Sequence, residues 1–209
     1  MAGSNLTGRE SRWVAAAQAG DVKSFEALVS LYERRIYHIA HRLVENTYDA
    51  EDVLQETFLK AFENLKRFRG ESSFYTWIVR IAVNAALQKV NRRRRHPTVS
   101  IDDSSNQDAD FRPKEIVAWE EDPETLYSRK ETQIILQKAI SSLPVIYRTV
   151  FLLKDVENVP VDVIARTLSI SLPAAKSRLI RARLELREYL SSYFRKKGAP
   201  VYPADHHHH

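Results

Sequence analysis

Apolar residues recur every three or four positions over most of this chain, the spacing that places them on one face of an α-helix. The clearest stripe lies between residues 24 and 44 and comprises Phe25, Leu28, Val29, Tyr32, Ile36, Ile39, Ala40 and Leu43. Similar spacing predicts helices over residues 12–19, 49–66, 73–91, 126–142, 144–153, 160–168 and 172–194. In the helix over residues 49–66 we expect Asp49 to be the cap, and we expect the apolar stripe to comprise Val53, Leu54, Phe58, Ala61, Phe62 and Leu65. Five glycines and eight prolines in 209 residues are too few for a protein of many turns, so the expected fold class is all-α.

The helical pattern stops between residues 96 and 125. This segment contains Pro97, Pro113 and Pro123 and a polar run from Asp102 to Asp110, a composition typical of a linker. The sequence therefore predicts two small helical domains, residues 1–95 and 126–197, joined by a flexible linker. Residues 198–209 form a C-terminal tail whose four final histidines we interpret as a tag. Neither domain shows an obvious large apolar surface for packing against the other.

Charge divides along the same boundaries. Residues 1–95 carry 16 Lys and Arg against 11 Asp and Glu, whereas residues 96–125 carry 2 against 9. Residues 126–140 (3 against 1) and 141–205 (11 against 6) are again basic. Basic domains favour polyanions, nucleic acid first and membrane surfaces second. With no cysteine and no apolar run of about 18 residues, we expect a cytoplasmic protein without membrane insertion.

The C-terminal domain has the layout of a helix-turn-helix. Ile164, Ala165 and Leu168 precede a short connection at Ser169–Ser171, after which a basic helix follows. Residues 173–197 hold eight bases and two acids, which favours DNA binding over a merely solvated face. We expect Leu179, Ala182, Leu186 and Leu190 to face inward and Lys176, Arg178, Arg181 and Arg183 to face elsewhere, with Ser171 capping the helix.

The N-terminal domain carries a different nucleic-acid signature. Aromatic residues alternate with cations around Gly70, a pattern suited to stacking on unpaired bases while holding the backbone: Phe68, Phe74, Tyr75 and Trp77 with Lys66, Arg67, Arg69 and Arg80. Several of these rings could instead belong to the core. We expect Trp77 to be buried and Phe68 not to be buried.

Two further patterns in the N-terminal domain each have more than one interpretation. Asp52, Gln55, Glu56 and Glu63 lie off the apolar stripe of their helix, which indicates either a solvated face or a protein-binding face. His38 and His41 are one helical turn apart, but without cysteines or a second cluster we interpret them as core-edge residues and expect no metal site. No catalytic constellation is recognised, so we expect a non-enzymatic protein without a cofactor.

These motifs, in this order, resemble the sigma-70 family of bacterial transcription initiation factors, specifically its extracytoplasmic-function (ECF) group. The resemblance to family region 2 runs from Asp49 to Phe62, through Phe68–Gly70 and Phe74–Ile78, to Arg80–Asn84. It resumes in region 4 at Leu143–Pro144 and at Lys176–Arg183. Together the two regions cover about 150 residues.

The resemblance implies a role for each group of residues. Region 2 would bind the clamp helices of the largest subunit of core RNA polymerase through Asp52, Gln55, Glu56 and Phe58. It would open the promoter −10 element with Phe68, Arg69, Ser73, Phe74, Tyr75, Arg80 and Asn84. Region 4 would contact the polymerase flap and read the −35 element with Lys176, Ser177, Arg178, Ile180 and Arg181. The resemblance also implies inhibition by an anti-sigma factor, and places the acidic linker in a basic polymerase channel.

The chain departs from the family pattern at two places. Leu172–Ala175 replaces the small polar, glycine and threonine residues that usually open the recognition helix, so a threonine contact to phosphate is absent there. Pro160–Val163 replaces the commoner acidic pair.

The alternative interpretation is a two-domain helix-turn-helix regulator that acts on duplex DNA without being a polymerase subunit. An enzyme acting on nucleic acid would need a metal-binding acidic cluster, which the scattered acids do not form.

Overall fold

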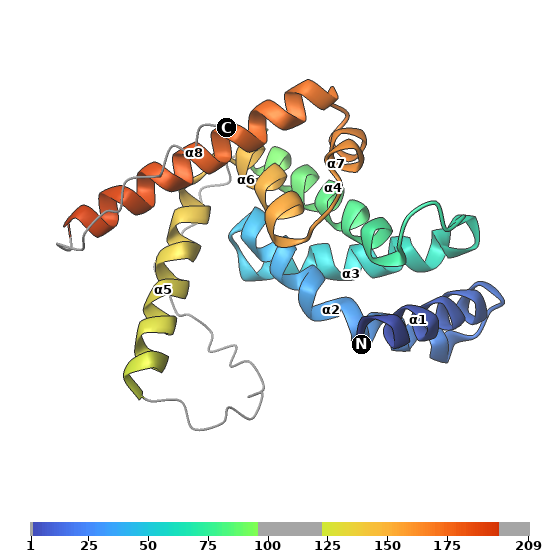
Figure 1. Cartoon of the computed structure of the whole chain (residues 1–209). Coiled ribbons are helices and arrows are strands. Elements are labelled where there is room, and N and C mark those ends of the chain that lie inside the picture. Colours follow the sequence, from blue (N-terminus) through green and yellow to red (C-terminus); the bar gives the residue numbers. More distant parts are fainter. Residues whose placement is uncertain (1, 96–122, 197–209) are drawn as a thin grey trace, which may run out of the picture.

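The computed structural model describes residues 2–95 and 123–196, and the side chains within residues 8–95 and 131–195. Those residues form helices and turns arranged as two helical domains (Figure 1). The N-terminal domain comprises α1 (Ala2–Gln18), α2 (Val22–Val44), α3 (Thr47–Asn64), a 3-10 turn η1 (Leu65–Arg67) and α4 (Phe74–Arg95). The C-terminal domain comprises α5 (Pro123–Ser142), α6 (Val145–Phe151), a π-helical turn η2 (Leu152–Val156), α7 (Val161–Thr167) and α8 (Leu172–Lys196). The expected all-α class with two helical domains is confirmed.

The helix starts follow local capping chemistry. Asp21 accepts from the amide of Lys23 and begins α2, Ser73 accepts from Thr76 and begins α4, and Ser171 accepts from Ala174 and begins α8. The cap of α3 differs from the expectation. Asn46, not Asp49, accepts the amide hydrogen bond, at 2.9 Å from the Asp49 nitrogen. Asp49 lies instead in the first turn, where the helix dipole favours an acid.

The N-terminal domain is held together by α2, α3 and α4. Leu28, Ile36 and Ile39 of α2 are buried against Val53 of α3 and Ile78 of α4. The amphipathic stripe expected between residues 24 and 44 supplies this core. Helix α4 continues through the four arginines to Arg95, beyond the expected end near residue 91.

The C-terminal domain is built around α8. Leu179, Ala182 and Leu186 are buried on one side of that helix, as expected, and Ile164 of α7 is buried with them. Helix α5 begins at Pro123, three residues before its expected start at residue 126. Of the expected linker, residues 96–122 lie outside the described part of the chain, as does the tail from residue 197. No helix in the described ranges is long and apolar enough to cross a membrane.

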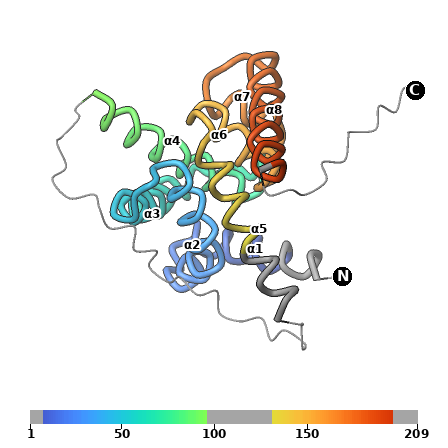
Figure 2. Tube along the Cα trace, turned by 90° about the vertical axis from the view of Figure 1, so that its left-hand side faces the viewer, coloured from blue at the N-terminus to red at the C-terminus, as the bar shows by residue number. Residues whose placement is uncertain are grey.

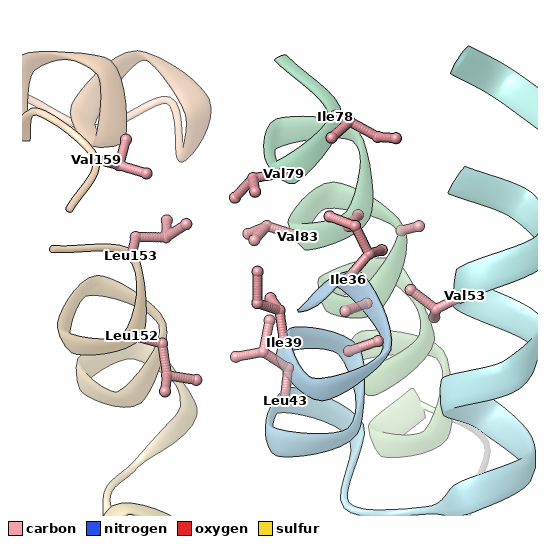
Figure 3. Close-up of a cluster of buried hydrophobic side chains, with 14 of the residues drawn as sticks. Ile36, Ile39, Leu43, Val53, Ile78, Val79, Val83, Leu152, Leu153 and Val159 are labelled. Atoms are coloured by element: carbon pink, nitrogen blue, oxygen red, sulfur yellow. The ribbon is translucent and has the colours of Figure 1, made fainter. Parts of the chain in front are cut away.

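The expectation that the two domains lack an apolar surface for each other is wrong. Leu152, Leu153 and Val159 of the C-terminal domain belong to the same buried cluster as Ile39 and Val83 of the N-terminal domain. Figure 3 shows these side chains facing one another across the boundary between the domains. In Figures 1 and 2, α6 lies beside α2 and α4, and α8 lies on the outer side of α6.

Candidate nucleic-acid and protein interfaces

The first candidate surface is the outer face of α8. One exposed face over the first turns of this helix carries Lys176, Ser177, Ile180 and Arg181. Ile180 is 58% exposed. Arg178 is half-buried, so it stands at the edge of this face. An exposed apolar residue between cations is suited to a DNA groove, where methyl groups and acceptor atoms occur together.

Neighbouring side chains hold the cations of α8 in place. The hydroxyl of Tyr147 in α6 lies 3.3 Å from a guanidinium nitrogen of Arg181. Arg183 donates to both carboxylate oxygens of Asp155, at 2.9 and 2.6 Å, and this pairing raises the pKa of Arg183. Arg183 is therefore engaged within the protein, whereas Lys176 and Arg181 point to the surface. The sequence pattern did not distinguish Arg183 from the other arginines.

The second candidate surface is the outer face of α3. Asp52, Gln55, Leu59 and Phe62 are exposed at helical spacing, with Leu59 59% and Phe62 51% exposed. The two apolar residues were missed by the sequence reasoning, which placed Phe62 on the buried stripe. Its ring packs edge-on against Phe25, with the ring centres 5.0 Å apart, and so covers the core from outside. A mixed acidic and apolar face of this kind is suited to binding another protein.

The other residues expected on this surface have partners within the protein. Lys89 of α4 donates to Asp52 at 2.5 Å and to Asp49 at 3.1 Å, and these bonds raise the pKa of Lys89. Glu56 pairs with Lys60 one turn along the helix, at 2.6 Å. Phe58 is half-buried and packs against the core, so only part of its ring is accessible.

The third candidate surface is the aromatic loop between η1 and α4. The ring of Phe68 lies 5.0 Å from that of Trp77 and 5.9 Å from that of Phe74. Phe68 and Trp77 are both half-buried, so Phe68 is not buried, as expected, whereas the expectation of a buried Trp77 is wrong. The amide of Gln18 in α1 donates to the carbonyls of Leu65 and Phe68, at 3.0 and 2.8 Å, and fixes the start of the loop.

The remaining residues of this set divide by exposure. Arg69, Ser73 and Asn84 are exposed and Arg80 is half-buried, so all four can reach a ligand. Phe74 is only 3% exposed, so its ring belongs to the core and supports the loop from beneath. Tyr75 is half-buried, and its hydroxyl donates to Glu157 of the C-terminal domain. Burial first, and this hydrogen bond second, raise the pKa of Tyr75.

In the part of the chain that the structure describes, His, Cys, Asp and Glu side chains do not gather in groups of three or more that could hold a metal ion. His38 is half-buried beside other aromatic and charged groups, with the ring of Tyr37 6.0 Å away. Partial burial, together with Arg42, Arg34 and His41, lowers the pKa of His38. This environment disfavours the cationic imidazole and is consistent with a residue at the edge of the core.

Comparison with known proteins matches both halves of the chain. The family model described as sigma-70 region 2 matches residues 28–96, which include the α3 surface and the aromatic loop. The model described as sigma-70 region 4 matches residues 133–186, which include the exposed face of α8.

Curated proteins match over nearly the whole chain. The RNA polymerase sigma-H factor of Pseudomonas aeruginosa is 32% identical over 191 residues, covering 90% of this chain and 97% of that protein. The ECF RNA polymerase sigma-E factor of Escherichia coli is 35% identical over 173 residues, covering 81% of this chain and 88% of that protein.

Solved structures share the fold. A co-crystal of the sigma factor RpoE with the anti-sigma factor NepR, from Bartonella quintana, matches with a TM-score of 0.60 and 25% identity, covering 81% of this chain and 98% of RpoE. CnrH, solved in complex with the cytosolic domain of CnrY, matches with a TM-score of 0.59 and 22% identity, covering 88% and 98% of the two chains.

Proposed function

This chain belongs to the extracytoplasmic-function group of the sigma-70 family, and from that premise we propose which of its surfaces performs each step of transcription initiation. As a sigma factor, it binds core RNA polymerase and directs the enzyme to promoters. The observation that carries this function is the presence of regions 2 and 4 in one chain that aligns with sigma factors over 81–90% of its length. A regulator acting on duplex DNA without polymerase is not supported by these relatives.

The face of α8 is proposed to read the promoter −35 element. Lys176, Ser177, Ile180 and Arg181 are exposed together, and Arg178 stands at their edge. A helix of this kind fits the major groove, where an arginine can bind a guanine edge through two hydrogen bonds. In the first turn of α8, Ala174 and Ala175 donate to the hydroxyl and the carbonyl of Ser171, and Pro173 has no amide hydrogen. The contacts of α8 to DNA are therefore proposed to come from its side chains.

The outer face of α3 is proposed to bind the clamp helices of the polymerase. Asp52, Gln55 and Glu56 supply charge and hydrogen bonding, and half-buried Phe58 supplies part of an apolar edge. We add Leu59 and Phe62 to this surface because both are exposed on the same side of the helix. Apolar groups at the centre of a protein interface and polar groups around them are the usual arrangement.

The aromatic loop and the adjoining face of α4 are proposed to hold the opened −10 element. Phe68, Arg69 and Ser73 line the loop, while Arg80 and Asn84 follow on α4. Tyr75 belongs to this set once its hydroxyl is released, and Phe74 contributes by supporting Phe68 from the core. Unpaired bases stack on such rings with a gain of about 1–3 kcal/mol each.

Two further properties complete the proposal. The chain acts inside the cell as a binding subunit, without catalysing a reaction of its own. An anti-sigma factor is proposed to inhibit it, because the RpoE structure that it resembles is a complex with such a factor. The acidic segment 96–125 is proposed to enter a basic channel of the polymerase, an arrangement favoured by its net charge.

Reconstitution tests the function and the surfaces together. The purified chain is combined with core RNA polymerase on a library of genomic DNA, and transcript starts are mapped. We expect starts downstream of a shared pair of −35 and −10 sequences, which disappear when the chain is omitted. Random starts, or starts that do not depend on the chain, would contradict the proposal.

A further inference from the structure

One short segment of the C-terminal domain packs its apolar side chains against the N-terminal domain. Residues 152–159 supply three buried apolar side chains, Leu152, Leu153 and Val159. They lie in a single cluster with buried residues of α2 and α4, which Figure 3 shows on the opposite side of the boundary: Ile39, Leu43, Val79 and Val83. Separating the domains would expose apolar surface on both sides of this boundary to water, so the contact favours a closed arrangement.

The same segment places an acid on the N-terminal domain. The side chain of Glu157 is only 8% exposed and lies 3.0 Å from a guanidinium nitrogen of Arg35 in α2. It also accepts the hydroxyl hydrogen of Tyr75 in α4. The Arg35 guanidinium in turn lies 3.9 Å from the centre of the Tyr75 ring. One carboxylate thus joins two helices of the other domain, and its burial makes the loss of either partner costly.

A second polar contact crosses the boundary nearby. Arg148 of α6 is 4% exposed and lies 2.8 Å from a carboxylate oxygen of Glu45. It donates to the carbonyl of Arg42 in α2, and within its own domain to the carbonyls of Ser141 and Leu143. Arg148 therefore ties the last turn of α2 to the start of α6.

The closed arrangement is incompatible with promoter geometry. The −10 and −35 elements are about 25 base pairs apart by their positions, which is about 85 Å along duplex DNA at about 3.4 Å per base pair. Two domains of this size in direct contact have centres only about 30 Å apart. Both elements can be bound at once only if the contact between the domains is broken.

We propose that the free chain is held closed by its own interdomain contact, with Glu157 as an electrostatic latch on Arg35 and Tyr75 that inhibits promoter binding until the domains separate. This inference rests on the function proposed above, because it supposes that the two domains act at separate promoter elements. The latch also occupies Tyr75, one of the residues proposed for the −10 element. The contact is intramolecular, so it needs no inhibitor protein to form.

A distance measurement on the full chain tests the latch without polymerase or DNA. The chain contains no cysteine, so Glu26→Cys and Ser192→Cys provide two exposed labelling sites, one in each domain. We expect a single narrow distance distribution in the otherwise unchanged chain. Glu157→Lys, which places a cation against Arg35, should give longer and broader distances. Tyr75→Phe, which removes only one hydroxyl, should give a smaller shift in the same direction.

Two matched variants separate the latch from a general effect of charge. Asp162→Lys makes the same charge change on α7, where Asp162 pairs with Arg166 of its own helix, and it should leave the distances unchanged. The double variant Arg35→Glu with Glu157→Arg reverses the pair and should restore the narrow distribution. Unchanged distances in Glu157→Lys, or a double variant that stays open, would overturn the latch.

Core polymerase supplies the functional measurement. Core polymerase positions the two domains at separate promoter elements and so binds the open form. If the closed form dominates by about tenfold, releasing it raises the apparent affinity for core polymerase by up to about tenfold. We expect this gain in Glu157→Lys, its loss in the double variant, and no gain in Asp162→Lys. An opened chain without any gain in affinity would show that closure does not inhibit. A failure of the unchanged chain to initiate transcription would instead refute the proposed function and leave the distances unaffected.

Discussion

At the scale of single residues, Arg181 is the side chain whose role in promoter reading can be tested most directly. It is exposed on α8, with Tyr147 3.3 Å away to orient it. Arg181→Ala should weaken binding to the preferred −35 sequence by about 1–3 kcal/mol, the usual contribution of an arginine that binds a base edge. The measurement is holoenzyme affinity for promoters in which the −35 bases are changed one at a time.

The pattern of losses distinguishes a base contact from a phosphate contact. If Arg181 contacts a base, Arg181→Ala should lose discrimination at that one position of the −35 element. It should also lose little affinity for promoters in which that base is already changed. An equal loss on every sequence would identify a phosphate contact. Arg187→Ala, farther along the exposed side of α8, serves as the control and should leave base discrimination unchanged.

His38 gives the stability of the protein a predictable dependence on pH. Partial burial and the nearby Arg42, Arg34 and His41 lower its pKa below the ordinary 6.5, while Glu157 opposes them. Between the lowered value and about 6.5, the unfolded chain binds more protons than the folded chain. The free energy of unfolding should therefore fall as pH decreases below about 6.5, and level off below the pKa of the folded state.

Denaturant unfolding at a series of pH values measures this dependence. His38→Gln should flatten the decrease, because glutamine does not titrate in this range. His41→Gln, one helical turn away, is the matched comparison. Equal slopes in the unchanged chain and in His38→Gln would assign the pH dependence to another group.

At the scale of elements, the outer face of α3 should be separable from the core of its domain. Gln55 is exposed and Glu56 is half-exposed, while the core side of the helix is formed by Val53, Thr57 and Ala61. Gln55→Ala and Glu56→Lys should lower the affinity for core polymerase and leave the melting temperature nearly unchanged. The measurement is competition for core polymerase together with a thermal melt.

Glu71→Lys is a suitable control because Glu71 is exposed in the loop before α4 and is not part of the α3 surface. It makes the same charge change as Glu56→Lys and should preserve polymerase affinity. A large drop in melting temperature with unchanged affinity in the α3 variants would show that these residues act in packing.

The helices could be predicted because each core is lined by an apolar stripe of regular period. The residues at which the helices begin and end were harder to predict. Period and proline positions located the α-helices of the described residues, although α1 begins ten residues before its expected start at residue 12. The cap of α3 was assigned to Asp49 and lies at Asn46. Both residue types cap helices, so spacing alone could not choose between them. Exposure on α3 was also misjudged at Phe62, because an aromatic ring can cover the edge of a core and still be half accessible.

At the scale of the whole molecule, the contact between the domains could not be predicted from periodicity. Leu152 and Leu153 continue the apolar pattern of α6, and nothing in that pattern separates a residue buried within its own domain from one buried against another. Glu157 follows them as one acid among 27 Asp and Glu residues. Its role depends on Arg35 and Tyr75, which are 122 and 82 positions away in sequence.

The closed arrangement leads to a prediction for DNA binding by the isolated chain. Neither small basic domain offers a large DNA-binding surface alone, and closure prevents both from reaching their elements together. We expect weak binding to duplex DNA with little sequence preference and a steep decrease with salt, because contacts to phosphate dominate. Promoter specificity should appear only with core polymerase, whose binding to the α3 surface and to the C-terminal domain would favour the open arrangement. The measurement is affinity for promoter and scrambled duplexes at several salt concentrations, with and without polymerase. Tight, sequence-specific binding by the isolated chain would contradict the prediction.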